Sequence, residues 1–306
     1  MSEPRRGSDP LPLGGEHGLP YSKGMMARAL MAVGVEPQRA YELAVRIEHD
    51  LAARGADVAD LERIDELAAE ILGQEEGSGA VRQLRRFREL RELDVPLVVL
   101  IGGATGTGKS TVATELAYRL GITRVTSTDF VRQTMRAFFS YEFMPTVHYS
   151  SFEAGRVLPA EEQETGDPTL LGFLEQTRNV LVGVQASIDR ALAEGWSMVL
   201  EGVHLVPGMI PAAIPGALVV PCVLEIEDEE HHASHFFHRD LISEERRPVE
   251  KYLDHLGEIR RMQAYIVERA RRSGVPVIVN HDVDRAVADV MELVVSAAES
   301  LREPVS

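Results

Sequence analysis

The sequence predicts an α/β fold, in which helices flank a parallel sheet, together with a small N-terminal helical domain. From Val95 onwards short apolar runs alternate with amphipathic runs, whereas residues 23–72 show helical spacing only. A glycine-rich stretch, IGGATGTGKS, directly follows the first apolar run of the second region. Apolar strands that alternate with helices are typical of a parallel sheet covered on both faces. At 306 residues the chain is long enough for one large and one small domain.

The N-terminal region is expected to be helical after a disordered tail. Residues 1–18 are rich in glycine, proline and charge, which disfavours a packed core. Residues 19–78 are predicted to form the helical domain, with helices in KGMMARALMAVGV, EPQRAYELAVRIEHDLAARG and DLERIDELAAEIL. Pro37 near the start of the second helix and Gly55 past its end fit this interpretation. The stretch GQEEGSG over Gly73–Gly79 predicts a flexible break, so the second domain is placed at 79–306.

The second domain is predicted to begin with a connecting helix over Val81–Leu93 that leads into the sheet. Strands are expected in PLVVLI, TRVTS, SMVLE, ALVVPCVLEIE and VPVIVN. Helices are expected over Ser110–Leu120, Phe130–Phe139, Glu175–Glu194, Pro248–Arg272 and Asp284–Leu301. Ligands of parallel sheets bind at the carboxyl ends of the strands, so the residues that follow each strand are the candidate site.

The glycine-rich stretch has the spacing of a phosphate-binding loop. Gly103 is followed after four residues by Gly108, Lys109 and Ser110, and this pattern predicts a P-loop kinase-type sheet that binds ATP. Lys109 would reach the β- and γ-phosphates, and the Ser110 hydroxyl would bind Mg²⁺. The alternative is a glycine-rich turn that binds nothing, but a strand before the loop and a helix after it favour the nucleotide. The expected ATP contacts are Gly103, Ala104, Thr105, Gly106, Thr107, Gly108, Lys109, Ser110 and Thr111.

A carboxylate and two arginines follow the second strand. Asp129 lies where the strand meets a helix, and Arg132 and Arg136 follow on the same helical face. The carboxylate could orient or deprotonate an acceptor hydroxyl, or hold Mg²⁺ through water. The arginines could bind a phosphate of the acceptor through paired hydrogen bonds. The alternative is a helix cap at Asp129 beside two solvated arginines.

Two further strand ends and loops carry candidate substrate contacts. Glu201 follows the apolar run of the third strand, where P-loop proteins place a carboxylate that holds the metal or orients water. We expect Glu201 to contact the acceptor and Mg²⁺, partly through water; the alternative is an acid that caps the next turn. His148 and Tyr149 in PTVHYSSFEA could close over the acceptor, and an ordinary surface loop is an equal alternative. Asn280 ends the last strand and is a weak candidate for the adenine pocket.

The run EEHHASHFFHRDLISEERRPVEKY admits three interpretations. A metal site is conceivable because three histidines share a helical face, namely His231, His235 and His238. The favoured interpretation is a mobile segment that closes over the transferring phosphoryl group through Arg239, Arg246 and Arg247. A charged and solvated helix is the remaining alternative.

Composition excludes several classes of function. The chain has 48 acidic and 32 basic residues and a net charge of -16, which disfavours nucleic acid and anionic membranes as partners. The single cysteine, Cys222, lies in a predicted strand and excludes a disulfide framework or a zinc–thiolate site. The sequence shows neither a membrane-spanning apolar run nor a signal peptide, so the cytoplasm is the expected compartment.

Several blocks from Leu19 to about Asp282 resemble the 2-phosphoglycerate kinases of archaea and their bacterial relatives. The blocks are LPYSKGMMARALMAVGV, IGGATGTGKSTVATELAYRLGI, STDFVRQTMR, PTVHYSSFEA, LVGVQASIDRALAEG, LEGVHLVPG and RPVEKYLDHLGEIRRMQAYIV. Many kinases share the glycine loop, whereas PYSKG and RPVEKYLDHLGEIRRMQ are more specific. The resemblance implies a P-loop kinase that converts ATP and 2-phosphoglycerate to 2,3-bisphosphoglycerate. It also implies that residues 19–72 are similar to the helical part of an ATP-cone, a nucleotide-binding regulatory module, in shortened form.

We therefore expect an ATP- and Mg²⁺-dependent kinase of a small phosphorylated acid, with Lys109, Asp129 and Arg239 as catalytic residues. Arg132, Arg136, Arg246 and Arg247 would bind the anionic substrates. Two alternatives stay open. One is a kinase of another hydroxyl acceptor such as a sugar, polyol or nucleotide sugar, and the other is a non-catalytic ATP-responsive regulator. Self-association is left open.

Overall fold

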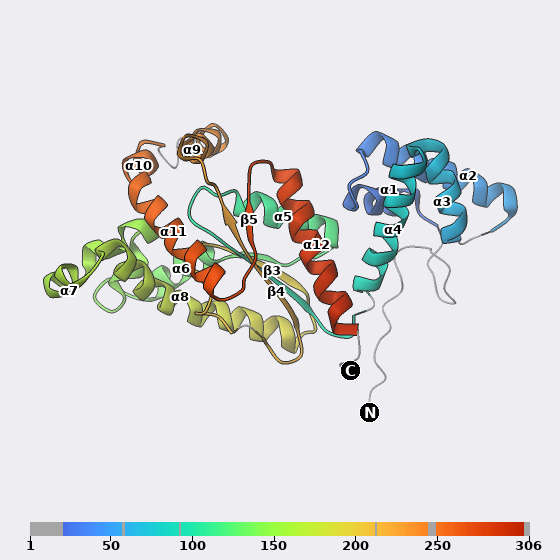
Figure 1. Ribbon diagram of the computed structural model, residues 1–306. Coiled ribbons are helices and arrows are strands. Elements are labelled where there is room, and N and C mark those ends of the chain that lie inside the picture. The colour runs from blue at the N-terminus through green and yellow to red at the C-terminus, as the bar shows by residue number, and fades with distance from the viewer. Residues whose placement is uncertain (1–20, 57–58, 92, 212, 244–248, 303–306) are drawn as a thin grey trace, which may run out of the picture. The chain divides into compact units, whose positions relative to one another are not determined.

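The computed structural model describes residues 21–302 except 57–58, 92, 212 and 244–248 (Figure 1). The expected disordered tail, residues 1–18, lies outside the described residues. The chain divides into two compact units, and the division along the sequence follows Asp94. The first unit is built from helices, and the second contains the sheet.

The helical unit comprises α1 (Lys23–Ala32), α2 (Pro37–Arg54), α3 (Leu61–Leu72) and α4 (Gln74–Arg91). The three helices predicted before residue 73 are thereby confirmed, and Gly55 ends α2 in the left-handed conformation with a φ of 63°. Apolar side chains at helical spacing form one core that includes Leu30, Leu43, Ile47, Ile64, Leu67 and Leu84. The unit therefore has a hydrophobic core of its own.

The flexible break predicted at Gly73–Gly79 is wrong. Helix α4 begins at Gln74 and continues through this stretch, and the compact units divide after Asp94 and not after residue 78. A Cβ atom at Gly77 would lie 2.6 Å from the carbonyl carbon of Ala68. The glycine therefore lets α4 approach the backbone of α3 closely, which is a packing role that composition alone does not distinguish from flexibility.

The second unit contains a sheet of five parallel strands in the order β2-β3-β1-β4-β5. The strands are β1 (Leu97–Gly102), β2 (Val125–Ser127), β3 (Met198–Glu201), β4 (Leu218–Glu225) and β5 (Val277–Val279). Each lies in a run that the sequence predicts as a strand, so the parallel α/β sheet is confirmed. Strands β1 and β3 pair so that Ile101 lies opposite Glu201, which brings their carboxyl ends to one edge.

Helices cover both faces of the sheet (Figure 1). They are α5 (Lys109–Leu120), α6 (Thr128–Phe138), α7 (Ala160–Thr165), α8 (Pro168–Ala193), α9 (Glu229–Ser243), α10 (Val249–Asp254), α11 (Leu256–Arg272) and α12 (Val283–Arg302). On one face α8 packs Val180, Val184 and Ile188 against Val98 and Leu100 of β1. Their spacing of four residues is the periodicity of one helical face. Within the described residues no helix is both long and apolar enough to cross a membrane.

The second unit also differs from the expected helices and loops: α8 begins at Pro168 and not at Glu175, and two further segments differ in kind. The helix predicted over Pro248–Arg272 is interrupted at His255, between α10 and α11. The His255 side chain donates from Nδ1 to the carbonyl oxygen of Lys251 at 2.8 Å and so takes an acceptor that a continuous helix would use. The segment PTVHYSSFEA is not a loose loop, because it forms the short 3₁₀ helices η1 (Pro145–His148) and η2 (Ser151–Val157).

Candidate active site

A cavity of about 850 Å³ lies at the carboxyl ends of the strands. Its walls come from the loop between β1 and α5, the start of α6, the first residues of η2, the end of β3 and helix α9. Many candidate residues line it, namely Thr105, Gly106, Gly108, Lys109, Ser110, Thr111, Asp129, Arg132 and Glu201. The structure thus brings together residues that are far apart in the sequence.

The glycine loop, residues 103–108, joins the end of β1 to the start of α5. Gly103, Gly106 and Gly108 have φ values of 138°, 88° and 82°, a region that residues with a Cβ rarely adopt. Lys109 begins α5, is largely buried, and donates from Nζ to the carbonyl oxygen of Ala104. The strand, the loop and the helix therefore form the arrangement of a phosphate-binding loop at a helix N-terminus.

Ser110 and Glu201 supply a pair of oxygen atoms at the cavity wall. The Ser110 hydroxyl donates to Oε1 of Glu201 at 3.0 Å, and Glu201 is buried at the end of β3. A hydroxyl and a carboxylate are the oxygen ligands that Mg²⁺ prefers. The donor set therefore fits the ion that the sequence predicts at these positions.

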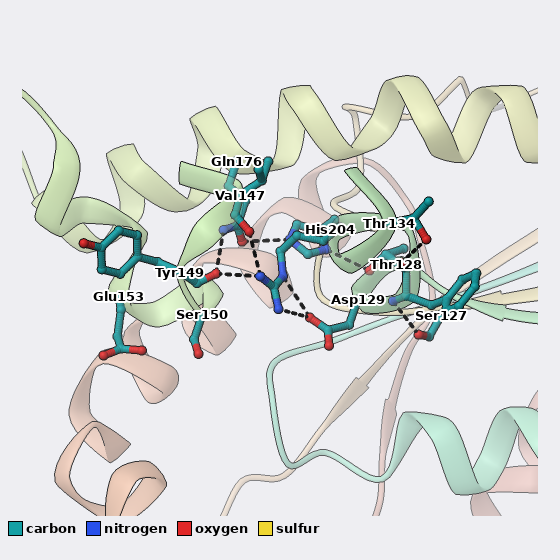
Figure 2. A network of polar contacts seen from close by, with 12 residues as sticks. Ser127, Thr128, Asp129, Thr134, Val147, Tyr149, Ser150, Glu153, Gln176 and His204 are labelled. Atoms are coloured by element: carbon teal, nitrogen blue, oxygen red, sulfur yellow. Dashed lines mark hydrogen bonds and ion pairs between the residues drawn. The ribbon is translucent and has the colours of Figure 1, made fainter. Parts of the chain in front are cut away.

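Asp129 and Arg132 both line the cavity, and Arg132 holds the Asp129 carboxylate. The Asp129 side chain is half exposed, whereas that of Arg132 is only 6% exposed. Arg132 donates from Nε to Oδ1 of Asp129 at 2.9 Å, and its Nη1 donates to the carbonyl oxygens of Val147 and Tyr149 (Figure 2). The Nη2 atom lies 2.8 Å from the same Asp129 oxygen. The guanidinium therefore orients the carboxylate and ties α6 to the η1–η2 segment.

Several candidate residues lie away from the cavity. Arg136 is exposed on α6 and is not part of the cavity wall. His148 donates from Nε2 to the carbonyl oxygen of Phe139 at 3.1 Å, and Tyr149 contributes its backbone carbonyl to Arg132. Neither ring lines the cavity, but Ser150, Ser151 and Phe152 do.

Only part of the arginine-bearing segment that follows β4 lies within the described residues. Arg239 lies in α9, but its side chain is outside the described residues, as are Arg246 and Arg247 entirely. The side chain of His238 is also outside them, whereas His231 and His235 line the cavity with their Nε2 atoms 3.3 Å apart. The described residues contain no group of three or more histidine, cysteine, aspartate or glutamate side chains placed to hold a metal.

A buried histidine behind the site has a role that sequence reasoning missed. Nδ1 of His204 accepts from the Thr128 hydroxyl at 2.8 Å, and its Nε2 donates to Oε1 of Gln176 at 2.9 Å (Figure 2). Gln176 in turn donates to the carbonyl oxygen of Tyr149, which Arg132 also contacts. Burial, helped by the nearby Arg132 charge, lowers the pKa of His204 to about 3. The available signal was a polar residue, Gln176, on the mostly apolar buried face of α8.

Comparison with known proteins identifies the family. The chain is 37% identical to a 2-phosphoglycerate kinase from Methanopyrus kandleri over 91% of this chain and 84% of that protein. It is 39% identical to a 2-phosphoglycerate kinase from Methanothermobacter thermautotrophicus over 89% of each. The chain belongs to the 2-phosphoglycerate kinase family.

The family assignment rests on these relatives. No family model matches the chain. A solved gluconokinase from Sinorhizobium meliloti 1021 is 16% identical, with a TM-score of 0.41, over 69% of this chain and 99% of that one. Family membership confirms the resemblance inferred from the sequence blocks and makes the chain a kinase of a small molecule. The cavity described above is the candidate active site of this family member.

Proposed function

We propose that the chain transfers the γ-phosphoryl group of ATP to the free hydroxyl of 2-phosphoglycerate and releases ADP and 2,3-bisphosphoglycerate. The observation that carries the proposal is the convergence of Lys109, Ser110, Asp129 and Glu201 on one cavity. The relatives named 2-phosphoglycerate kinase, which match this chain over most of their length, supply the acceptor. Their names support 2-phosphoglycerate over other hydroxyl acceptors.

The reaction exchanges one phosphorus–oxygen bond for another. The acceptor oxygen forms a bond to the γ-phosphorus while the bond to the bridging oxygen of ADP breaks. The proton of the acceptor hydroxyl passes to the Asp129 carboxylate, which Arg132 holds toward the cavity. Lys109 and the N–H groups of the glycine loop stabilise the charge on the phosphate oxygens. Most of the rate enhancement then comes from positioning and electrostatics.

Ser110 and Glu201 are the residues that would hold Mg²⁺, Glu201 partly through water. The ion, when bound, neutralises charge on the β- and γ-phosphates. Arg239, Arg246 and Arg247 remain proposed contacts of the transferring phosphoryl group, because in the sequence they follow His231 and His235, which line the cavity. Arg132 is reassigned from the acceptor phosphate to the orientation of Asp129.

The test is a turnover assay in which the product is identified by mass. The chain is incubated with ATP, Mg²⁺ and one acceptor at a time, namely 2-phosphoglycerate, 3-phosphoglycerate, glycerate, gluconate or glycerol. We expect ADP formation that depends on 2-phosphoglycerate, and a product heavier by one phosphoryl group. The Lys109→Ala variant should lose activity by roughly 10²–10³-fold while its melting temperature stays close to that of the wild type. Faster turnover of another acceptor, or ATP binding without turnover of any, would refute the proposal.

A further inference from the structure

The carbonyl groups of the glycine loop are held by side chains of α5, of α9 and of the residue after β5. Four successive backbone carbonyls, those of residues 104–107, each accept a hydrogen bond from a side-chain nitrogen. The pairs are Lys109 Nζ with Ala104 (2.5 Å), His232 Nε2 with Thr105 (2.8 Å), His235 Nδ1 with Gly106 (2.9 Å) and Asn280 Nδ2 with Thr107 (3.0 Å). Each backbone carbonyl from residue 104 to residue 107 therefore has a side-chain donor.

Fixing a carbonyl also fixes the N–H group of the same peptide unit. A peptide bond is planar and trans, so its C=O and N–H point in opposite directions. The four donors therefore aim the N–H groups of residues 105–108 away from themselves. Backbone N–H groups are what a phosphate-binding loop offers to an anion, and Thr105, Gly106 and Gly108 line the cavity, so these N–H groups are the ones available to phosphates there.

Two of the four donors are histidines of α9: His235, one of the three histidines for which the sequence suggested a metal site, and His232, which was not among them. A carbonyl oxygen only accepts, so His232 carries a proton on Nε2 and His235 carries one on Nδ1. The Nε2 atom of His235 then accepts from His231 Nε2 at 3.3 Å. The two rings use different nitrogens toward the loop.

The burial of His232 is explained by its contact with the loop. Its side chain is completely buried, and its other ring nitrogen, Nδ1, has no hydrogen-bond partner. Burial lowers the pKa of this imidazole to about 4, so it is neutral near pH 7. The loop also lies directly against the helix, since a Cβ atom at Gly106 would come within 2.5 Å of the Phe236 ring.

We propose that His232 and His235 are positioning residues for ATP, which hold the carbonyls of the glycine loop back so that its N–H groups face the phosphates. The inference rests on the proposed function of the cavity. It replaces metal binding as the role of His235, and it makes α9 part of the nucleotide site. The histidines act through the loop and need not touch the nucleotide.

The test replaces each of the two histidines by glutamine and, separately, by asparagine. The amide nitrogen of glutamine can take the place of a histidine Nε2, and that of asparagine can take the place of Nδ1. We therefore expect His232→Gln and His235→Asn to recover most of the affinity for ATP. We expect His232→Asn and His235→Gln to weaken it by roughly fivefold to tenfold, the effect of one lost hydrogen bond. Phe237→Ala, which changes an exposed side chain of the same helix, is the control.

The readout is the dissociation constant of Mg²⁺-ATP without acceptor, with thermal melting as a check on folding. His235 is only half-buried, so its two variants carry the test even where those of His232 fail to fold. If the wild type turns over but His235→Asn and His235→Gln bind ATP with equal affinity, the inference is overturned. It is also overturned if both variants lose affinity for ATP because they have lost a bound divalent metal. A wild type that does not bind ATP would overturn both the inference and the proposed function.

Discussion

Arg132 and Arg136 share a helical face in the sequence, but their contacts separate them. Arg132 is buried against Asp129 and two carbonyls, whereas Arg136 is exposed away from the cavity. We expect Arg132→Ala to lower kcat by roughly 10–100-fold, the equivalent of one or two charge-assisted hydrogen bonds. Arg136→Ala should stay within about twofold of the wild type, because no described contact joins it to the site.

Steady-state kinetics with each substrate varied separately measures this difference. Arg132→Lys should restore part of kcat, because an ammonium cannot reproduce the planar set of donors. A larger loss in Arg136→Ala than in Arg132→Ala, seen in the KM for the acceptor, would return Arg136 to the acceptor pocket.

His204 should make the stability of the protein sensitive to acid. Its pKa is about 3 in the folded chain, against about 6.5 in an unfolded one. Between pH 6.5 and pH 3 the unfolded chain therefore binds a proton that the folded chain does not. The folded chain keeps its full stability above pH 6.5 and loses stability as the pH falls from 6.5 toward 3. The free energy of unfolding should fall by up to about 1.4 kcal/mol per pH unit through this one group.

Denaturant titrations between pH 6 and pH 4.5 test this expectation. The His204→Gln variant lacks the titrating ring, so its free energy of unfolding should fall less steeply with decreasing pH. The difference between the two slopes should correspond to about one proton taken up on unfolding. Parallel slopes for the variant and the wild type would show that His204 titrates normally in the folded protein.

At the scale of elements, the contact between η2 and α8 depends on two glycines. A Cβ atom at Gly172 of α8 would overlap the backbone of Ala154 and Gly155, and one at Gly155 would overlap that of Pro168. Backbone cannot move aside as a side chain can, so Gly172→Ala should destabilise the protein by about 1–3 kcal/mol. Because η2 carries Ser151 and Phe152 of the cavity wall, activity should fall as well.

Gly257 offers a matched control for this substitution. It lies exposed in α11, and a Cβ atom there would meet nothing within 4 Å. Gly257→Ala should therefore be neutral or stabilise the protein by about 0.4–1 kcal/mol through helix propensity. Chemical denaturation of both variants is the measurement, and equal stability of the two would contradict the close contact.

At the scale of the whole molecule, the two units have separate cores. The apolar cluster of the helical unit runs from Met26 to Leu84, and two clusters of the sheet unit begin at Val98 and Ala104. A chain that starts at Asp94 should therefore fold and retain basal turnover. The helical unit, with its proposed ATP-cone-like role, would then serve regulation and not chemistry.

A chain that starts at Gly79 provides the comparison. It keeps the remainder of α4, including Val81 and Leu84, without the core against which they pack. It should aggregate more than the chain that starts at Asp94, as measured by light scattering and yield of soluble protein. If the shorter chain is folded but inactive, the helical unit contributes to the active site.

The sheet and the centre of the site were predictable because they depend on local patterns. Apolar runs gave the five strands, and the glycine spacing located the loop with Lys109 and Ser110. The topological rule that parallel strands gather ligands at their carboxyl ends then placed Asp129 and Glu201 at one edge. The 3₁₀ turns around His148 were not predictable, since their hydrogen bonds go to residues distant in the sequence.

The sequence by itself determined the fold class and the class of chemistry, since strand periodicity and loop spacing are properties of neighbouring residues. Only the tertiary structure decided which polar side chains line the cavity and which contact other parts of the chain. Arg132, His204, His232 and His235 look alike in the sequence as polar residues near strand ends or on helices. Their proposed roles follow from the groups that they contact, and the folded chain supplies those partners from as many as 129 positions away. A hydrogen-bond partner at that separation leaves no local pattern to detect.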